Sequence, residues 1–115
     1  MLMNTQISLR SSLLQGCLLL LGLFAGPASA ADRIESGMRL AATCANCHGT
    51  NGLAAGAEFA SLAGWPKRDT VTAMQDFRSG KRTATVMHQL AKGYTDEEVS
   101  LIAEYFAAQQ RPSKK

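Results

Sequence analysis

Apolar residues recur at helical spacing in three stretches of the chain, at residues 34–45, 71–77 and 99–106. None of the three shows the strict alternation that is typical of a half-buried strand. Gly80 follows the second stretch, and glycine is the residue most often found just after a helix. The pattern therefore predicts an all-α domain in which helices and loops enclose a small core.

The start of the last helix is marked by a capping box. The side chain of Thr95 can accept a hydrogen bond from the backbone amide of Glu98, while the Glu98 carboxylate reaches back to the amide of Thr95. Four apolar side chains follow at helical spacing and are expected to pack on the first helix and on the edge of a bound cofactor: Val99, Ile102, Tyr105 and Phe106.

Glycines interrupt the stretch between the first two helices and indicate a loop there. They are Gly49, Gly52, Gly56 and Gly64, and Pro66 follows them. Glycine allows a backbone to pass close to a neighbouring group, so this loop is suited to lie against a flat ligand.

The N-terminus has the three parts of a secretory signal peptide. Arg10 supplies the positive charge, residues 13–24 form an apolar run, and Ala28-Ser29-Ala30 is a small-residue cleavage site. We therefore expect a cleaved signal peptide at residues 1–30, a mature domain at residues 31–115, and a periplasmic location.

Two other interpretations of the N-terminus are less favourable. A permanent membrane anchor needs about 20 apolar residues, and Gly22, Gly26 and Pro27 interrupt the run. Cys17 resembles the cysteine of a lipoprotein signal, but the apolar run continues beyond it. We expect Cys17 to be removed with the signal peptide, and we expect no permanent anchor.

Composition limits the remaining function classes. The 115-residue chain has 12 Lys and Arg against 9 Asp and Glu, so its charge does not point to a nucleic-acid partner. The mature domain at residues 31–115 is near the size at which burial alone becomes marginal for a stable fold, and a covalently bound cofactor would add to its core.

The chemistry of the chain is concentrated in Cys44-Ala45-Asn46-Cys47-His48. Cys-x-x-Cys-His is the attachment motif of c-type haem: two thiols add to the vinyl groups of one porphyrin, and the adjacent imidazole binds the iron. A thioredoxin-like pair should follow a strand, and a zinc site needs two further ligands. The mature chain offers no third Cys and only one other His, so we predict one covalently attached haem c.

A six-coordinate electron-transfer haem needs a second axial ligand, and a methionine thioether raises the reduction potential. Met87 is the candidate, because the chain between Cys47 and Met87 is long enough to wrap a porphyrin. Met38 lies too close to the attachment motif, and Met74 is in phase with the second helix and is expected in the core. His88 is the remaining rival, which we expect to be an exposed polar neighbour.

These motifs resemble class I bacterial cytochrome c, in particular the cytochrome (haem) subunit of flavocytochrome c sulfide dehydrogenase and related short periplasmic cytochromes. The matching segments cover nearly the whole mature domain: residues 40–50, 61–64, 77–82, 85–87, 91–98 and 103–107. Two features depart from that group: there is a single haem motif, and Trp65 stands where similar sequences often have a polar residue.

The resemblance implies that Cys44 and Cys47 attach haem and that His48 and Met87 bind iron. It also implies a periplasmic one-electron carrier that is not itself an enzyme, with a sulfide-oxidising flavoprotein as its redox partner. The alternative is a free-standing soluble cytochrome c that shuttles electrons between respiratory complexes.

Two further haem classes are disfavoured. A peroxidase needs distal acid–base groups, for which His88 is the only candidate, and a gas sensor needs an output domain. A basic set is a candidate docking surface, although scattered cations are commonly just a solvated exterior. It consists of Lys67, Arg68, Lys81, Arg82 and Lys92.

Overall fold

The computed structural model describes residues 29–111, and all regular structure in this range is helical, as the sequence predicts. The three longer helices are α2 (Ala30–Ala41), α4 (Lys67–Ser79) and α6 (Asp96–Ala107). Two four-residue helices, α3 (Ala45–His48) and α5 (Met87–Leu90), and two 3-10 turns, η2 (Thr50–Gly52) and η3 (Ala91–Gly93), connect them. Of the expected signal peptide, residues 1–28 with Cys17 lie outside the described range.

The first helix differs from its expected bounds of 34–45. In the full 115-residue chain it begins at Ala30, where Ser29 caps it, and both residues belong to the expected signal peptide. The Ser29 hydroxyl accepts from the Asp32 amide at 3.3 Å, and the Asp32 carboxylate accepts from the Ser29 amide at 3.0 Å. It ends at Ala41, after which a tight turn forms as the Cys44 amide donates to the Ala41 carbonyl at 3.0 Å. The prediction that this helix itself runs into the haem motif was wrong, and the separate helix α3 carries Cys47 and His48.

The second predicted helix is confirmed as α4. Gly80 ends it in the left-handed conformation, with φ 78°, and the Gly80 amide donates to the Phe77 carbonyl. Met74 is 8% exposed, which confirms its expected place in the core. Helix α5 was not predicted, because four residues are too few to show helical periodicity.

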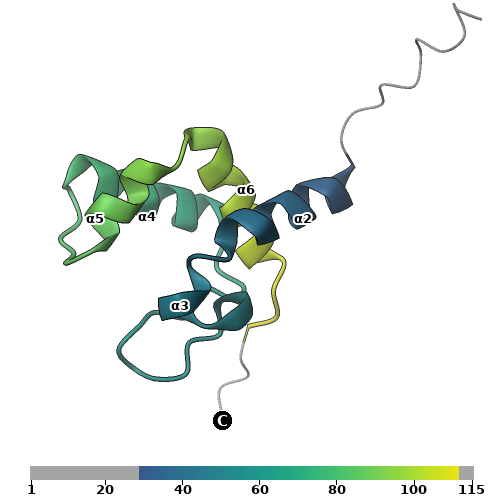
Figure 1. Ribbon diagram of the computed structural model, residues 1–115, viewed down its shortest axis with the longest axis horizontal. Coiled ribbons are helices and arrows are strands. Elements are labelled where there is room, and N and C mark those ends of the chain that lie inside the picture. The colour runs from purple at the N-terminus through teal and green to yellow at the C-terminus, as the bar shows by residue number, and fades with distance from the viewer. Residues whose placement is uncertain (1–28, 112–115) are drawn as a thin grey trace, which may run out of the picture.

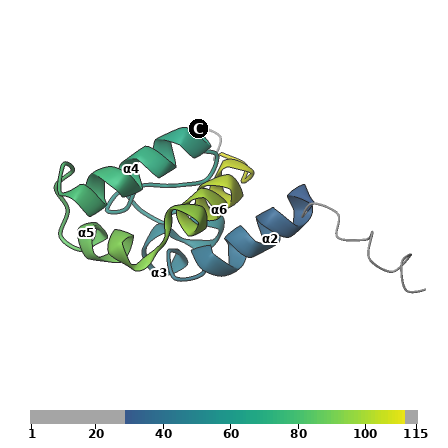
Figure 2. The same cartoon turned by 90° about the horizontal axis from the view of Figure 1, so that it is seen from above.

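Helix α6 begins with the predicted capping box. Thr95 Oγ1 accepts from the Glu98 amide at 3.2 Å, and Glu98 Oε2 accepts from the Thr95 amide at 2.7 Å. This helix lies between α2 and α4 and contacts both (Figure 1 and Figure 2).

Two clusters of buried side chains form on the two sides of α6. Ile102, Tyr105 and Phe106 pack with Ala41 of α2, as expected. Val99 does not join them and packs instead with Met74 of α4 and Ala91 of η3. Val99 was expected to pack on the first helix and on the haem edge. The first part was wrong, since its position on α6 turns it toward α4, and the cluster that it joins is the one against which Met87 packs.

Helices α2 and α6 approach each other at a glycine. A Cβ at Gly37 would lie 2.9 Å from the Cβ of Tyr105, so a larger residue would push the helices apart. Glu104 of α6 adds a polar link, because its carboxylate accepts from Arg33 of α2 at 3.0 Å and from Lys67 of α4 at 3.1 Å. One carboxylate thus joins all three long helices.

No helix within residues 29–111 has both the length and the apolar character that crossing a bilayer requires.

Candidate haem site

The two thiols of the predicted attachment motif lie one helical turn apart on α3. Cys44 is the N-terminal flanking residue of this helix and is half-buried against the cluster around Phe106, while Cys47 is exposed. Both are free cysteines. Residues at this spacing share a helix face, so both sulfurs are available to one ligand.

The protonation of Cys44 follows from its position. Burial raises the pKa of the Cys44 thiol above its ordinary value, so at neutral pH this sulfur is a neutral thiol.

The competing uses of a Cys-x-x-Cys pair find no support in the described structure. No strand precedes the motif in residues 29–111, as a thioredoxin-like site would require. Across the same residues, no cluster of three or more His, Cys, Asp and Glu side chains has the arrangement needed for a metal ion. The arrangement therefore favours haem attachment over a disulfide or zinc site.

His48 is oriented by a backbone carbonyl. Its Nδ1 lies 2.7 Å from the carbonyl oxygen of Ala60, which can only accept, so Nδ1 carries the proton and donates. The other ring nitrogen, Nε2, is then left with its lone pair for a metal. The ring also meets Phe59 edge to face, with centroids 6.2 Å apart. This geometry is the one that an iron-binding imidazole needs.

The backbone directly after Ala60 is held in turn by Gly52. The Gly52 carbonyl accepts from the amides of Leu62 at 2.8 Å and Ala63 at 3.1 Å, and from the hydroxyl of Ser61 at 2.7 Å. A Cβ at Gly52 would lie 2.8 Å from the Phe106 ring, so only glycine fits there. The backbone therefore leaves the core and returns at a set position just after Ala60.

Met87 lies on a different element from the other three predicted site residues. It opens α5, is half-buried, and packs against the cluster of Met74, Ala91 and Val99. In Figure 1, α5 lies beside α4, and α3 with its loop lies below them. The structure thus brings Cys44, Cys47 and His48 together at one short helix and its N-cap, and it places Met87 on a separate short helix, α5.

The other candidate ligands are less well placed than Met87, although the exposure predicted for one of them was wrong. Met38 lies on α2 and is 49% exposed. His88 is half-buried beside Phe77 and Lys92, so the expectation that it is exposed was wrong. Its position next to Met87 on a helix turns its side chain about 100° away from that of Met87.

Large exposed apolar side chains occur near His48 and near Met87 in the sequence, and they suit a flat apolar cofactor. Leu53 and Phe59 belong to the loop that holds His48, and Val86 and Leu90 lie within three positions of Met87; all four are 44–56% exposed. Exposed apolar residues thus accompany the two thiols and the imidazole in one part of the fold and the Met87 thioether in another, and side chains of these types match the chemistry of a porphyrin and its iron. The residues present therefore fit haem.

Sequence reasoning missed the parts of this site that act through the backbone. The carbonyl of Ala60 has no side-chain signature, and nothing in the loop distinguishes Ala60 from Ala57 beforehand. The bond from the Tyr105 hydroxyl to Asn51 Oδ1, at 2.7 Å, was also missed. Asn51 has a left-handed backbone, with φ 57°, which its short polar side chain tolerates better than most.

This small helical domain with a Cys-x-x-Cys-His site matches a known family over most of its length. The cytochrome c family model matches residues 34–109, and the chain belongs to that family. Membership implies covalently attached haem c, and Cys44 and Cys47 fit its attachment motif. The chain is therefore of the electron-carrier class.

Several characterised bacterial proteins are similar in sequence. The cytochrome subunit of sulfide dehydrogenase from Chlorobaculum tepidum is 49% identical over 67 residues, which are 58% of this chain and 60% of that protein. Cytochrome c4 from Pseudomonas aeruginosa is 39% identical over 100 residues, 87% of this chain and 49% of that protein. The thiosulfate dehydrogenase electron acceptor from Stutzerimonas stutzeri is 36% identical over 73 residues, which are 63% of this chain and 34% of that protein. The matched regions thus cover from about a third to three fifths of these relatives.

Proposed function

We propose that this chain is a periplasmic one-electron carrier, the cytochrome subunit that accepts electrons from a sulfide-oxidising flavoprotein. In this proposal Cys44 and Cys47 form thioethers to a single haem c, and His48 and Met87 are the axial iron ligands. Catalysis on sulfide belongs to the flavoprotein chain.

Each residue has a defined task in this carrier. When bound, haem c supplies a one-electron iron couple. Cys44 and Cys47 hold the group permanently, so the protein does not lose it on reduction. The Ala60 carbonyl keeps His48 in the tautomer with a free Nε2. Met87 offers a soft thioether from a half-buried position, which stabilises the reduced state.

The observation that carries the proposal is the hydrogen bond from His48 Nδ1 to the Ala60 carbonyl. An imidazole whose Nδ1 is committed to a carbonyl presents Nε2 as a ligand in a fixed direction. Because two free thiols precede it on the same short helix, the three groups together are suited to one porphyrin.

The proposal is tested first on the purified mature protein. Intact mass should show one haem added to a chain that begins at Ala31. The iron should be low-spin in both oxidation states, with a weak far-red band from sulfur ligation in the ferric form, and carbon monoxide should bind the reduced protein poorly. A mature protein with two alkylatable thiols and no bound haem would overturn the proposal, and rapid stoichiometric carbon monoxide binding would favour a sensor or an enzyme.

The subunit role has its own test. Two of the similar proteins are named for partnerships with dehydrogenases of reduced sulfur compounds, sulfide and thiosulfate. We therefore expect this chain to co-elute with a flavin-containing protein and to be reduced by sulfide only when that partner is present. Obligate subunit interfaces are larger and more apolar than passing redox contacts, so such a complex should survive a sizing column.

A free-standing soluble cytochrome c is the second candidate. The similarity to cytochrome c4, whose name specifies no dehydrogenase partner, supports it, because that match covers 87% of this chain and the match to the sulfide dehydrogenase subunit covers 58%. A protein that stays monomeric and exchanges electrons rapidly with several unrelated respiratory complexes would establish this role and exclude the first.

A further inference from the structure

Met87 opens a segment with little regular structure of its own. Residues 87–95 consist of the four-residue helix α5, the 3-10 turn η3 and two extended residues, Tyr94 and Thr95. A helix of four residues closes too few backbone hydrogen bonds to be stable alone. The position of the Met87 side chain therefore depends on what holds this segment to α4, which lies beside α5 (Figure 1).

Arg78 of α4 holds the segment at three points. Its guanidinium donates to the carbonyl of Ala91 at 3.2 Å, to the carbonyl of Tyr94 at 2.8 Å and to the carboxylate of Asp96 at 2.6 Å. The planar fork of arginine reaches several acceptors at once, which a lysine ammonium does less well. The Arg78 side chain is partly buried, so these bonds are shielded from water on one side. One side chain thus ties the whole of residues 91–96 to α4.

The first of these acceptors is bonded directly to Met87. The amide of Ala91 donates to the carbonyl of Met87, while the carbonyl of Ala91 accepts from Arg78. Ala91 is also fully buried with Met74 and Val99, in the cluster against which Met87 packs. A change in the position of Ala91 would therefore move Met87 as well.

The second acceptor connects the Met87 segment to the haem attachment motif. Tyr94, whose carbonyl accepts from Arg78, shares a hydrogen bond of 2.5 Å between its hydroxyl and Thr43 Oγ1. Thr43 directly precedes Cys44. Arg78 and Tyr94 together therefore link the segment that carries Met87 to the residue before the first cysteine of the motif.

We propose that Arg78 is a positioning residue for Met87, and that Tyr94 carries its effect to the attachment motif. The inference rests on the proposed function, in which Met87 is the sixth iron ligand. A thioether favours reduced iron, so its bond to ferric iron is the weaker one and depends more on how firmly the protein holds the sulfur. An added ligand that competes for the sixth position binds more weakly when Met87 is held more firmly.

The test measures imidazole binding to the ferric, haem-loaded protein, followed by the loss of the far-red band. Arg78→Gln should bind imidazole at least roughly tenfold more tightly than the native protein, which is the contribution of one hydrogen bond to a charged group. Arg78→Lys keeps the charge without the fork and should recover only part of the native value. A merely structural role would lower the stability of Arg78→Gln and leave its affinity for imidazole unchanged, and that result would overturn the proposal.

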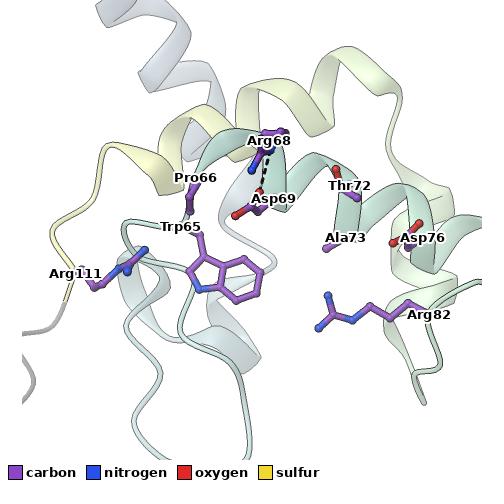
Figure 3. Close-up of a pocket in the computed structure, with 9 residues that line it drawn as sticks. All are labelled: Trp65, Pro66, Arg68, Asp69, Thr72, Ala73, Asp76, Arg82 and Arg111. Carbon is purple, nitrogen blue, oxygen red and sulfur yellow. Dashed lines mark hydrogen bonds and ion pairs between the residues drawn. The ribbon is translucent and has the colours of Figure 1, made fainter.

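Arg68→Gln is the matched control, because Arg68 lies on the same helix and also has an aspartate partner. Figure 3 shows its ion pair with the neighbouring Asp69, at 3.2 Å. The Arg68 side chain is 88% exposed, and its bond goes to Asp69 instead of to residues 87–96. Its affinity for imidazole should stay within about twofold of the native value. Equal increases in Arg68→Gln and Arg78→Gln would overturn the proposal, because they would show only an effect of charge.

A second pair of variants tests the link through Tyr94 and leaves the guanidinium in place, so it decides the question even if Arg78→Gln yields no haem-loaded protein. Tyr94→Phe removes the hydroxyl that bonds Thr43, and Tyr105→Phe removes the hydroxyl that bonds Asn51 at 2.7 Å. Imidazole should bind Tyr94→Phe about threefold more tightly than Tyr105→Phe, the contribution of one neutral hydrogen bond. Equal affinities would overturn the proposal.

Failure of this inference is distinguishable from failure of the proposed function. A native ferric protein without the far-red band would overturn Met87 as the ligand, and with it the proposed function. A native protein that shows the band, together with unchanged imidazole affinity in Arg78→Gln, would overturn the role of Arg78 alone.

Discussion

The segment around His48 is held by backbone hydrogen bonds, whereas the segment around Met87 is held by side-chain packing. On the first side, the carbonyls of Ala60 and Gly52 fix the imidazole and its loop. On the second side, Met87 opens a four-residue helix and rests on a cluster of apolar side chains. The first arrangement is sensitive to any change in backbone path, and the second to the volume of side chains.

Two glycines show the same contrast. Gly49 and Gly80 have nearly equal positive φ angles of 77° and 78°. A Cβ at Gly49, next to His48, would lie 2.6 Å from the carbonyl carbon of Leu53, while a Cβ at Gly80 would meet nothing within 4 Å. The two sides therefore differ in the room around the backbone as well as in its conformation.

The largest effect is expected from Gly49→Ala. Its backbone, with ψ 161°, lies in a region that only glycine occupies readily, and the added methyl group would collide with Leu53. We expect a loss of roughly 3–5 kcal/mol in the free energy of unfolding and a lower yield of haem-loaded protein. Gly80→Ala is the matched control and should cost only about 1–2 kcal/mol. Denaturant titration of the two variants measures the difference, and equal losses would remove the contrast between the two sides.

Met87→Ala should change the chemistry more than the fold. Truncation of this half-buried side chain should cost about 2 kcal/mol of stability, near the lower end for methionine. It should also open the iron to water or added imidazole, abolish the far-red ferric band and lower the potential. Met38→Ala is the control, because Met38 is 49% exposed on α2. If Met38→Ala changed the spectrum and Met87→Ala did not, the ligand assignment would be wrong.

Thr95→Ala should have a smaller effect on the Met87 side. The Thr95 hydroxyl caps α6, directly after the turn that follows α5. We expect a loss of about 1 kcal/mol, with Thr95→Ser close to the native value because serine caps equally well. Thermal unfolding of the haem-loaded variants gives this difference. A Thr95→Ser variant as unstable as Thr95→Ala would show that the methyl group, not the cap, matters.

The smallest effect is expected from Glu104→Gln, which tests the link between the two sides. Hydrogen bonds from Arg33 and then Lys67 lower the pKa of Glu104 below its ordinary value. Stability from this group is therefore fully present above the unfolded-state pKa of about 4.3, and it is lost as the pH falls through the lower folded-state value. The native protein should be slightly more stable than Glu104→Gln at pH 7, and the difference should disappear at low pH. A difference that grows on acidification would contradict this assignment.

The sequence predicted those parts of the fold that depend on local chemistry. The capping box at Thr95, the glycine that ends α4 and the core position of Met74 are all confirmed, because each rests on a few neighbouring residues. The bounds of α2 were wrong because Ala42 and Ala45 continue the apolar period while the backbone turns at residues 42–44. Val99 was expected on the first helix and the haem edge, and it packs on α4 instead of α2 because periodicity gives a buried face without saying which helix covers it.

The candidate site likewise has residues that the sequence could predict and a group that it could not. Cys44, Cys47 and His48 form a contiguous motif, and the structure holds them on one helix. The role of Met87 was a prediction from distance along the chain, and it stays a proposal here, supported by the half-buried position of the residue. The Ala60 carbonyl was beyond sequence reasoning, because any residue can supply a carbonyl and only the folded path selects one.

Because Gly52 accepts three hydrogen bonds, the loop that follows it could change in length without moving His48. Because the chain returns to Gly52 at Ser61, Leu62 and Ala63, residues 53–59 form an excursion whose ends are already fixed. A Cβ at Gly56 would meet nothing within 4 Å, and doubling a loop's length costs only about 0.6 kcal/mol. Gly56 is therefore a suitable place to insert a peptide tag or a surface anchor, which would tether the carrier to an electrode through the loop nearest its haem motif.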